Sequence, residues 1–286
     1  MADTFTRRAM LGGAAAAGIT AASTALGEQQ PNPPLKGRLK QSACRWCYSR
    51  LTLDQLCEAG KAIGLQGIDL LSENEWAICN KYGLTVSMSN GPGNITEGWN
   101  RLENHDRLVK ESERLLPLVK AAGAPNMIVF SGNRRGQTDA DGLANCCTGI
   151  KRIMPLAEQL GVNVLMELLN SKRTHKDYQC DHTAWGVELC NRVASSRFKL
   201  LYDIFHAQIM EGDICDTIRE NIQYIGHFHT GGVPGRNELD ETQELNWRRI
   251  AQAIAESGYT GFVAHEFVPK RDPLTSLRQA VQLMDV

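Results

Sequence analysis

The sequence predicts an α/β protein built as a single (β/α)8 TIM barrel, and three observations support this prediction. Apolar runs of strand length alternate with amphipathic stretches of helix length, which is typical of βαβ units around a parallel sheet. Several helical stretches end at a glycine just before the next apolar run, as at Gly64, Gly161 and Gly258. Eight such units in about 250 residues fit a closed barrel better than an open doubly wound sheet.

The predicted elements follow one another in a regular order after residue 40. Strands are expected at residues 41–46, 67–71, 84–89, 126–131, 163–167, 199–203, 224–229 and 261–266. The clearest helices are expected at residues 53–63, 105–122, 142–160, 182–193, 214–222 and 245–257. No GxGxxG pattern follows the first strand, so a dinucleotide site in an open sheet has no support.

The first 35 residues are expected to lie outside the barrel. Arg7 and Arg8 precede a small and apolar run from residue 12 to residue 26, which is the pattern of a twin-arginine export signal. We therefore predict a signal peptide and linker at residues 1–35 and a barrel domain at residues 36–286. The apolar run is shorter than the roughly 20 residues that span a bilayer. The mature protein is thus expected in the periplasm or another extracytoplasmic compartment, free of the membrane.

Composition argues against a nucleic-acid partner. In the 286-residue chain, 31 Lys and Arg nearly balance 32 Asp and Glu, which gives a formal charge of −1. Phosphate backbones attract clustered basic surfaces, and this balance gives no sign of one. The nine cysteines leave at least one unpaired, and Cys44 and Cys47 have no second pair at zinc-finger spacing. The cysteines are therefore expected to be structural.

Four consecutive predicted strands end in a side chain that can bind a metal ion. These side chains are Glu167, Asp203, His229 and Glu266. In a TIM barrel the carboxyl ends of the strands meet at one mouth, where the active site lies. Carboxylates gathered there would repel one another without a cation, and this donor set suits Mn2+ or Mg2+, with Co2+ or Zn2+ as substitutes. The sequence therefore predicts one divalent metal ion bound by these four residues.

Motifs around these strand ends resemble the hydroxypyruvate isomerase family of the xylose isomerase-like TIM barrels. The segment Tyr202-Asp203-Ile204-Phe205-His206 is similar to the family's sixth-strand motif, and Glu167-Leu168-Leu169-Asn170 is similar to its fifth-strand motif. Pro234-Gly235-Arg236-Asn237-Glu238 and His265-Glu266-Phe267 resemble its later motifs, and the resemblance spans residues 41–284. Leu168 and Gly232 depart from the family pattern, and His229 matches the ketose 3-epimerase branch.

The resemblance implies an isomerase that moves a proton next to a carbonyl. A divalent metal would hold the carbonyl oxygen and the adjacent hydroxyl of a small sugar or hydroxy-keto acid. Glu167 and Glu266 would then act as general base and acid through an enediolate. The residues expected to contact the substrate are His206, Arg236, Trp46, Asn170, Lys172 and His105.

Two other functions stay open at this level. One is a ketose or 3-keto-sugar epimerase or eliminase, in which the second carboxylate returns the proton to the opposite face of the same carbon. The other is a non-catalytic, metal-containing subunit that binds sugars. A zinc nuclease of the same barrel type is disfavoured, because it would need more histidines and a basic face. Related barrels often pair, so a homodimer is compatible with the resemblance.

Overall fold

The computed structural model describes residues 34–286, and a compact unit begins at Leu35. The predicted twin-arginine signal lies outside the described residues. From Leu35 onward the chain forms one sheet of eight parallel strands in the order β3-β2-β1-β8-β7-β6-β5-β4. The strands are β1 Lys40–Cys44, β2 Gly67–Asp69, β3 Thr85–Val86, β4 Asn126–Val129, β5 Asn163–Glu167, β6 Phe198–Asp203, β7 Ile225–Thr230 and β8 Phe262–His265.

The two edge strands in this order, β3 and β4, are connected by backbone hydrogen bonds of Ser89, a residue that follows β3. The Ser89 N–H donates to the Asn126 carbonyl at 2.9 Å, and the Ile128 N–H donates to the Ser89 carbonyl at 3.1 Å. The fold is therefore TIM-barrel-like, and all eight predicted strands are present, although β2 and β3 are shorter than the predicted residues 67–71 and 84–89. The predicted strand at residues 41–46 was wrong at its end, because β1 ends at Cys44 and Trp46 lies in the following 3-10 helix.

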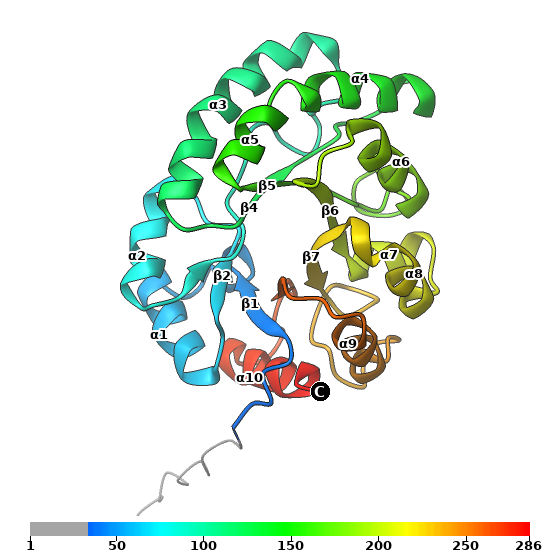
Figure 1. Cartoon of the computed structure of the whole chain (residues 1–286). Helices are drawn as coiled ribbons and strands as arrows, with labels where there is room; N and C mark the ends of the chain where they lie inside the picture. Colours follow the sequence, from blue (N-terminus) through cyan, green and yellow to red (C-terminus); the bar gives the residue numbers. More distant parts are fainter. Residues whose placement is uncertain (1–33) are drawn as a thin grey trace, which may run out of the picture. The chain divides into compact units, whose positions relative to one another are not determined.

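Helices surround the strands on the outside (Figure 1). The α-helices are α1 Leu53–Ile63, α2 Trp76–Lys81, α3 His105–Ala121, α4 Asp139–Lys151, α5 Met154–Leu160, α6 Thr183–Val193, α7 Ile204–Met210, α8 Ile214–Asn221, α9 Trp247–Glu256 and α10 Pro273–Met284. The 3-10 helices are η1 Arg45–Tyr48, η2 Glu73–Glu75, η3 Leu102–Asn104 and η4 Ile222–Tyr224.

Local chemistry sets the limits of α1. Thr52 Oγ1 accepts from the Gln55 N–H at 3.1 Å, and Gln55 Oε1 accepts from the Thr52 N–H at 2.8 Å, so the first turn is capped on both sides. The helix ends at Gly64, whose φ of 103° is left-handed and suits a residue without a Cβ. Between these ends, Leu56 and Cys57 lie on the buried face.

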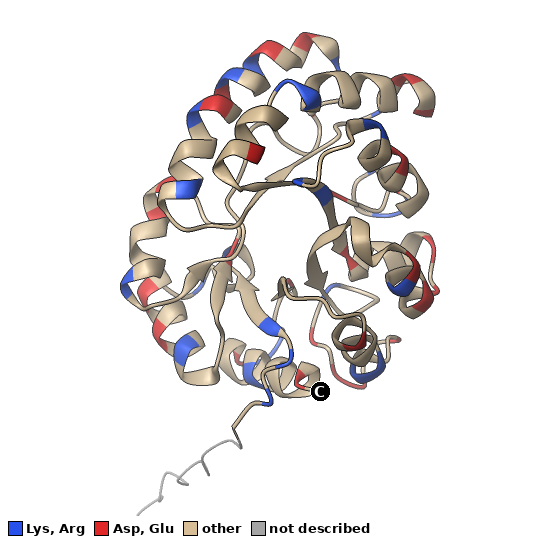
Figure 2. Cartoon of the chain, viewed as in Figure 1, with Lys and Arg blue, Asp and Glu red and all other residues tan. Residues whose placement is uncertain are grey.

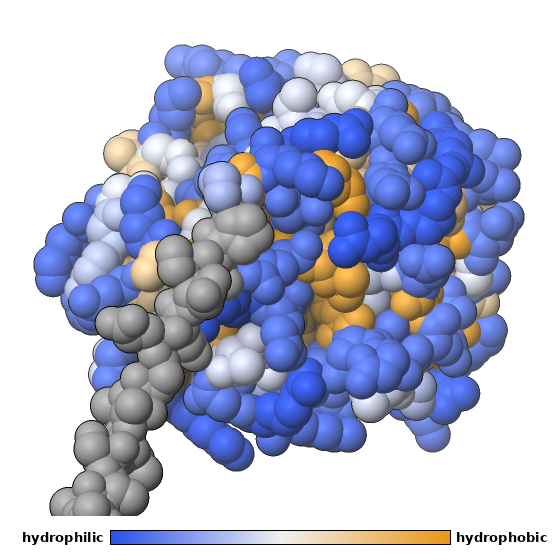
Figure 3. Space-filling view, turned by 90° about the horizontal axis from the view of Figure 1, so that it is seen from below, coloured by the Kyte–Doolittle hydropathy of each residue, from blue (hydrophilic) through white to orange (hydrophobic). Residues whose placement is uncertain are grey.

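Charged residues lie mainly on the outer helices and loops, with both signs interspersed (Figure 2). On the face shown in Figure 3, most side chains are hydrophilic, and hydrophobic side chains gather in a recess. No helix in the described part of the chain has the length and apolar character needed to cross a membrane. The main core fills the space between strands and helices, and a smaller separate cluster consists of Met88, Ile128, Leu165 and Leu201.

Candidate active site

Four side chains from consecutive strands meet at the carboxyl end of the sheet. Glu167 ends β5, Asp203 ends β6, His229 lies near the end of β7, and Glu266 follows β8. One potential ligand atom from each lies within 4.8 Å of the others, and all four residues are buried. His229 Nδ1 is 2.5 Å from Glu266 Oε2, 3.5 Å from Glu167 Oε1 and 3.9 Å from Asp203 Oδ2. The structure thus brings together the four residues that the sequence singled out.

Asp69, at the end of β2, fixes the orientation of the His229 ring. Its Oδ2 is 2.9 Å from His229 Nε2, while its Oδ1 accepts from the Ser87 hydroxyl at 2.6 Å and lies 3.1 Å from His227 Nε2. A carboxylate acceptor draws the ring proton to Nε2, which leaves Nδ1 facing the three carboxylates. This Nδ1 is buried and lies at hydrogen-bonding distance, 2.5 Å, from Glu266 Oε2. Sequence reasoning missed Asp69, although it closes an apolar strand as the other acids do.

Burial disfavours the charged form of the three carboxylates in this cluster. It raises the pKa of Glu167, and the contact with His229 offsets only part of that change. Burial also raises the pKa of Asp203 to about 7, although Arg236 acts in the opposite direction. Burial alone would raise the pKa of Glu266, but Arg236 and His229 hold it well below its usual range. A bound cation would favour the charged forms of all three carboxylates.

Arg236 lies against the cluster and contacts two of its carboxylates. Its Nη2 donates to Asp203 Oδ2 at 2.5 Å and to Glu266 Oε2, and its Nε donates to the Glu266 carbonyl at 3.2 Å. The guanidinium carbon is 5.6 Å from the ring centroid of Trp46 and 5.0 Å from that of Phe205. A guanidinium held in this way can pair with carboxylate or hydroxyl oxygens of a ligand.

His206, in the first turn of α7, contacts both Asn170 and Arg236 through its ring nitrogens. The Asn170 backbone N–H donates to His206 Nδ1 at 3.1 Å. The Asn170 side-chain oxygen accepts from the N–H groups of Arg173 and Thr174, so its amide nitrogen also faces Nδ1, at 2.6 Å. His206 Nε2 is 3.0 Å from Arg236 Nη1, so the ring meets N–H groups on both sides. His206 therefore helps to hold the Arg236 guanidinium beside the carboxylate cluster.

The remaining predicted substrate contacts differ in position. Trp46 donates its indole N–H to Glu266 Oε1 at 2.7 Å and therefore belongs to the site. The ammonium group of Lys172 does not face the cluster, because it donates to two carbonyl oxygens at the end of α7, at 3.1 and 2.8 Å. The predicted contact of His105 with the substrate is corrected by the structure. The His105 ring is buried at the start of α3, with Nε2 2.9 Å from the Trp99 carbonyl.

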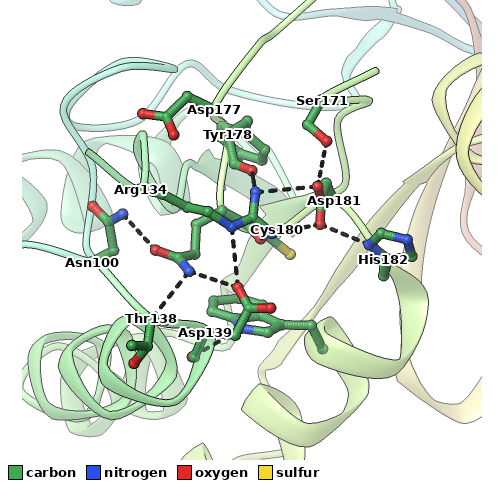
Figure 4. Close-up of polar contacts among 12 residues, drawn as sticks. Asn100, Arg134, Thr138, Asp139, Ser171, Asp177, Tyr178, Cys180, Asp181 and His182 are labelled. Atoms are coloured by element: carbon green, nitrogen blue, oxygen red, sulfur yellow. Dashed lines mark hydrogen bonds and ion pairs between the residues drawn. The ribbon is translucent and has the colours of Figure 1, made fainter. Parts of the chain in front are cut away.

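A second polar network holds the loop of residues 168–182, which carries Asn170 (Figure 4). Arg134 donates from Nη2 and Nη1 to the two carboxylate oxygens of Asp181, at 2.9 and 3.2 Å. Asp181 also accepts from Ser171 Oγ at 2.5 Å and lies 2.8 Å from His182 Nδ1. Because Ser171 follows Asn170 directly, the Arg134–Asp181 pair fixes the segment that orients His206.

The sequence model of the family described as Xylose isomerase-like TIM barrel matches residues 57–285, so the chain belongs to this family. It is 29% identical over 170 residues to the putative hydroxypyruvate isomerase of Homo sapiens. This aligned region is 58% of this chain and 61% of that protein. It is also 34% identical over 122 residues to the D-psicose 3-epimerase of Agrobacterium fabrum. That aligned region is 41% of this chain and 39% of the epimerase. Among solved structures, a 3-keto-D-glucoside 4-epimerase from E. coli has a TM-score of 0.71 at 17% identity, with 86% of this chain and 98% of that chain covered.

These matches confirm the family resemblance inferred from the motifs, and they also set its extent. The chain spans 61% and 39% of the lengths of the two curated relatives. Their names describe an isomerase and an epimerase, whereas the likeness to the E. coli structure concerns the fold.

Proposed function

We propose that this protein is a metal-dependent isomerase or epimerase that moves a proton next to the carbonyl of a small sugar or hydroxy-keto acid. The observation that carries the proposal is the convergence of one potential ligand atom from each of Glu167, Asp203, His229 and Glu266 on one place. Membership of the Xylose isomerase-like TIM barrel family, with relatives named as isomerases and epimerases, supports it.

The donor set fits one divalent cation. Carboxylate oxygens with a single imidazole nitrogen suit Mn2+ or Mg2+. His229 Nδ1 lies within 3.9 Å of an oxygen of each of the three carboxylates, so one cation could contact all four residues. When bound by Glu167, Asp203, His229 and Glu266, such a cation would polarise the substrate carbonyl and acidify the neighbouring C–H.

Glu167 and Glu266 supply the groups that move the proton. Burial raises the pKa of Glu167, which makes its carboxylate a stronger base. Glu266 is held by the Trp46 indole at Oε1 and by Arg236 at Oε2, so its orientation is fixed. If Glu167 removes the proton and returns it to the adjacent carbon, the outcome is isomerisation. If Glu266 returns it to the opposite face of the same carbon, the outcome is epimerisation.

The Arg236 guanidinium holds the substrate oxygen on which negative charge develops. It lies beside the carboxylate cluster and is 3.0 Å from His206 Nε2. Burial lowers the pKa of His206 well below its usual range, and nearby Arg236 lowers it further, so the ring stays neutral next to the guanidinium. A fixed donor in a buried site stabilises an oxyanion better than mobile water does.

Deuterium incorporation tests this function. Hydroxypyruvate, ketohexoses and 3-keto-glucosides are each incubated with the protein and Mn2+ in D2O, and deuterium beside the carbonyl is measured by NMR. Glu167→Gln keeps the side-chain volume but removes the base, so exchange should fall by at least about 100-fold. Asp203→Asn should instead weaken Mn2+ binding, and excess Mn2+ should restore part of the activity.

The matched control is Glu113→Gln on the exposed side of α3, which should leave exchange unchanged. Wild-type turnover by a double variant, Glu167→Gln with Glu266→Gln, would contradict the proposal. No exchange with any substrate, together with unchanged ligand affinity in Glu167→Gln, would favour the non-catalytic sugar-binding subunit.

A further inference from the structure

A cavity of about 300 Å3 opens beside Trp46 and Val268, and the proton transfer proposed above does not use it. Its walls come from η1 with the residues just after it and from the segment that follows β8. We call this cavity the Trp46 pocket. Ser49, Arg50 and Arg271 contribute polar groups to its lining, and its apolar side chains are Trp46, Tyr48, Leu51, Val268, Pro269 and Pro273. It adjoins the carboxylate cluster, because the Trp46 indole is bonded to Glu266 Oε1 at 2.7 Å.

The Trp46 pocket keeps apolar surface open to solvent. Trp46 is 45% exposed and Val268 is 41% exposed, and they are two of the four exposed large hydrophobic residues in the described part of the chain. The Trp46 ring is held in place, since its N–H is bonded to Glu266 and Arg236 lies against the ring. An open apolar wall beside a group of convergent polar side chains is typical of a ligand site.

A second cavity of about 490 Å3 lies at Phe205 and Arg236 and has a more polar lining, which includes Arg173, Gln208 and Glu244. Arg236 connects the two cavities, because its guanidinium packs against the ring of Trp46 as well as that of Phe205. Arg236 also contacts the carboxylate cluster. The reacting part of a ligand at this cluster would therefore have one cavity at each end.

We infer that the substrate extends to both sides of its reacting carbon and places a ring-shaped substituent in the Trp46 pocket. This inference rests on the proposed function. A three-carbon keto acid would leave both cavities largely empty, because pockets of several hundred Å3 commonly hold much larger molecules. The polar cavity suits sugar hydroxyls, and the flat wall of Trp46 suits the apolar face of an aryl group or a second sugar ring. The substrate class is thus a glycoside of a carbonyl sugar.

Binding of unreactive glucosides tests the Trp46 pocket separately from catalysis. Isothermal titration calorimetry on the full chain with Mn2+ compares methyl β-D-glucoside, phenyl β-D-glucoside and cellobiose. At least one of the two ligands with a second ring should bind about tenfold more tightly than the methyl glucoside. The tighter of the two identifies the substituent as aryl or as sugar.

Variants of the pocket separate the ring of Trp46 from its hydrogen bond. Trp46→Ala and Val268→Asp should abolish the preference for the second ring. Trp46→Phe keeps an aromatic face without the N–H, so the preference should persist even where turnover falls. Leu118→Ala removes a comparable exposed side chain from α3, and it should leave the preference unchanged.

The outcomes distinguish this inference from the proposed function. Equal affinity for all three glucosides, or a preference that persists in Trp46→Ala, would overturn the inference even if the protein isomerises small keto acids. A ring preference that depends on Trp46 supports the pocket even if deuterium exchange shows no proton transfer, in which case the proposed function fails alone.

Discussion

A neighbouring residue holds the ring of each histidine in the candidate site, and we assign the two rings different roles. Asp69 accepts from His229 Nε2–H, which directs Nδ1 toward the carboxylates. Asn170 donates to His206 Nδ1, and the Nε2 of that ring is 3.0 Å from Arg236 Nη1. The His229 ring is therefore oriented toward a cation site, whereas the His206 ring positions the guanidinium of Arg236.

Replacing Asp69 tests the first of these assignments. Asp69→Asn keeps the shape but weakens the acceptor for His229 Nε2–H, so Nδ1 is protonated more often. We expect the affinity for Mn2+ to fall by about 10- to 100-fold, the usual effect of removing a carboxylate that supports a metal-binding histidine. Calorimetric titration with Mn2+ measures the change. Asp54→Asn, on the exposed face of α1, is the control, and equal affinity in both variants would refute the role of Asp69.

From the sequence, a residue could be assigned to the candidate site only where its position along a strand determined where its side chain lies. Glu167 and Asp203 each close an apolar strand, and parallel strands bring such ends together. The partnership of Asp69 with His229 depends on residues 160 positions apart, from strands that do not pair with each other. His105 has the chemistry of a ligand contact, but tertiary packing buries it against Trp99.

The loop between β5 and α6 shows how one element supports the site. Residues 168–182 carry Asn170, and Arg134 holds this loop through Asp181 and through the carbonyls of Tyr178 and Gln179. Figure 4 shows the Arg134 side chain extended toward Asp181. The loop is thereby tied to the preceding β4–α4 connection, which limits the movement of the residues that orient His206.

Removing the charge of Asp181 should destabilise this loop in a pH-dependent way. Burial would raise the pKa of Asp181, but hydrogen bonds from Arg134, Ser171 and His182 lower it below its usual range. A carboxyl with a lowered pKa stabilises the fold above its unfolded pKa of about 4, and the contribution disappears as the pH falls through the folded value. Asp181→Asn should therefore lower the free energy of unfolding by about 2–3 kcal/mol at pH 7.

Urea denaturation at several pH values measures this loss. The difference between wild type and Asp181→Asn should shrink as the pH falls from about 4 through the lowered folded pKa of Asp181, below which the wild-type carboxyl is neutral as well. Asp106→Asn, at an exposed ion pair with Arg152, should change the free energy of unfolding by less than about 0.5 kcal/mol at any pH. A difference that stays constant across this pH range would contradict the electrostatic explanation.

Element boundaries were predictable where caps and apolar runs agreed. The bounds of α1 match the prediction because Thr52 and Gly64 mark its ends in the sequence. The expected single helix at residues 142–160 is two helices, α4 and α5. Pro155 stands at the start of α5, and a proline favours a first turn because it has no N–H to donate within a helix. The periodicity of the apolar residues continues across the break and conceals it.

At the scale of the whole barrel, the strands are supported by packing on two sides. Helices cover the outside, while Met88, Ile128, Leu165 and Leu201 form a separate cluster contributed by four neighbouring strand segments. Leu165 precedes the candidate base Glu167 by two residues on β5. A sequence pattern identifies Leu165 as buried, but it does not reveal which of the two cores contains it, because both faces of a barrel strand are apolar.

The packing of Leu165 against β7 provides the last prediction. Leu165→Ala should lower the free energy of unfolding by about 2–5 kcal/mol, because the side chain is fully buried. A Cβ at Gly226 would lie 2.7 Å from Leu165 Cδ2, so Gly226→Ala should cost about 1–3 kcal/mol through overpacking.

The double variant removes the clash along with the leucine. Its loss of unfolding free energy should therefore be smaller than the sum of the two single losses, by about 1 kcal/mol or more in denaturant titrations. Leu118→Ala, which lies far from this contact in the exposed part of α3, should combine additively with Gly226→Ala. Additive losses for Leu165 and Gly226 would show that Leu165 does not restrict the space at Gly226.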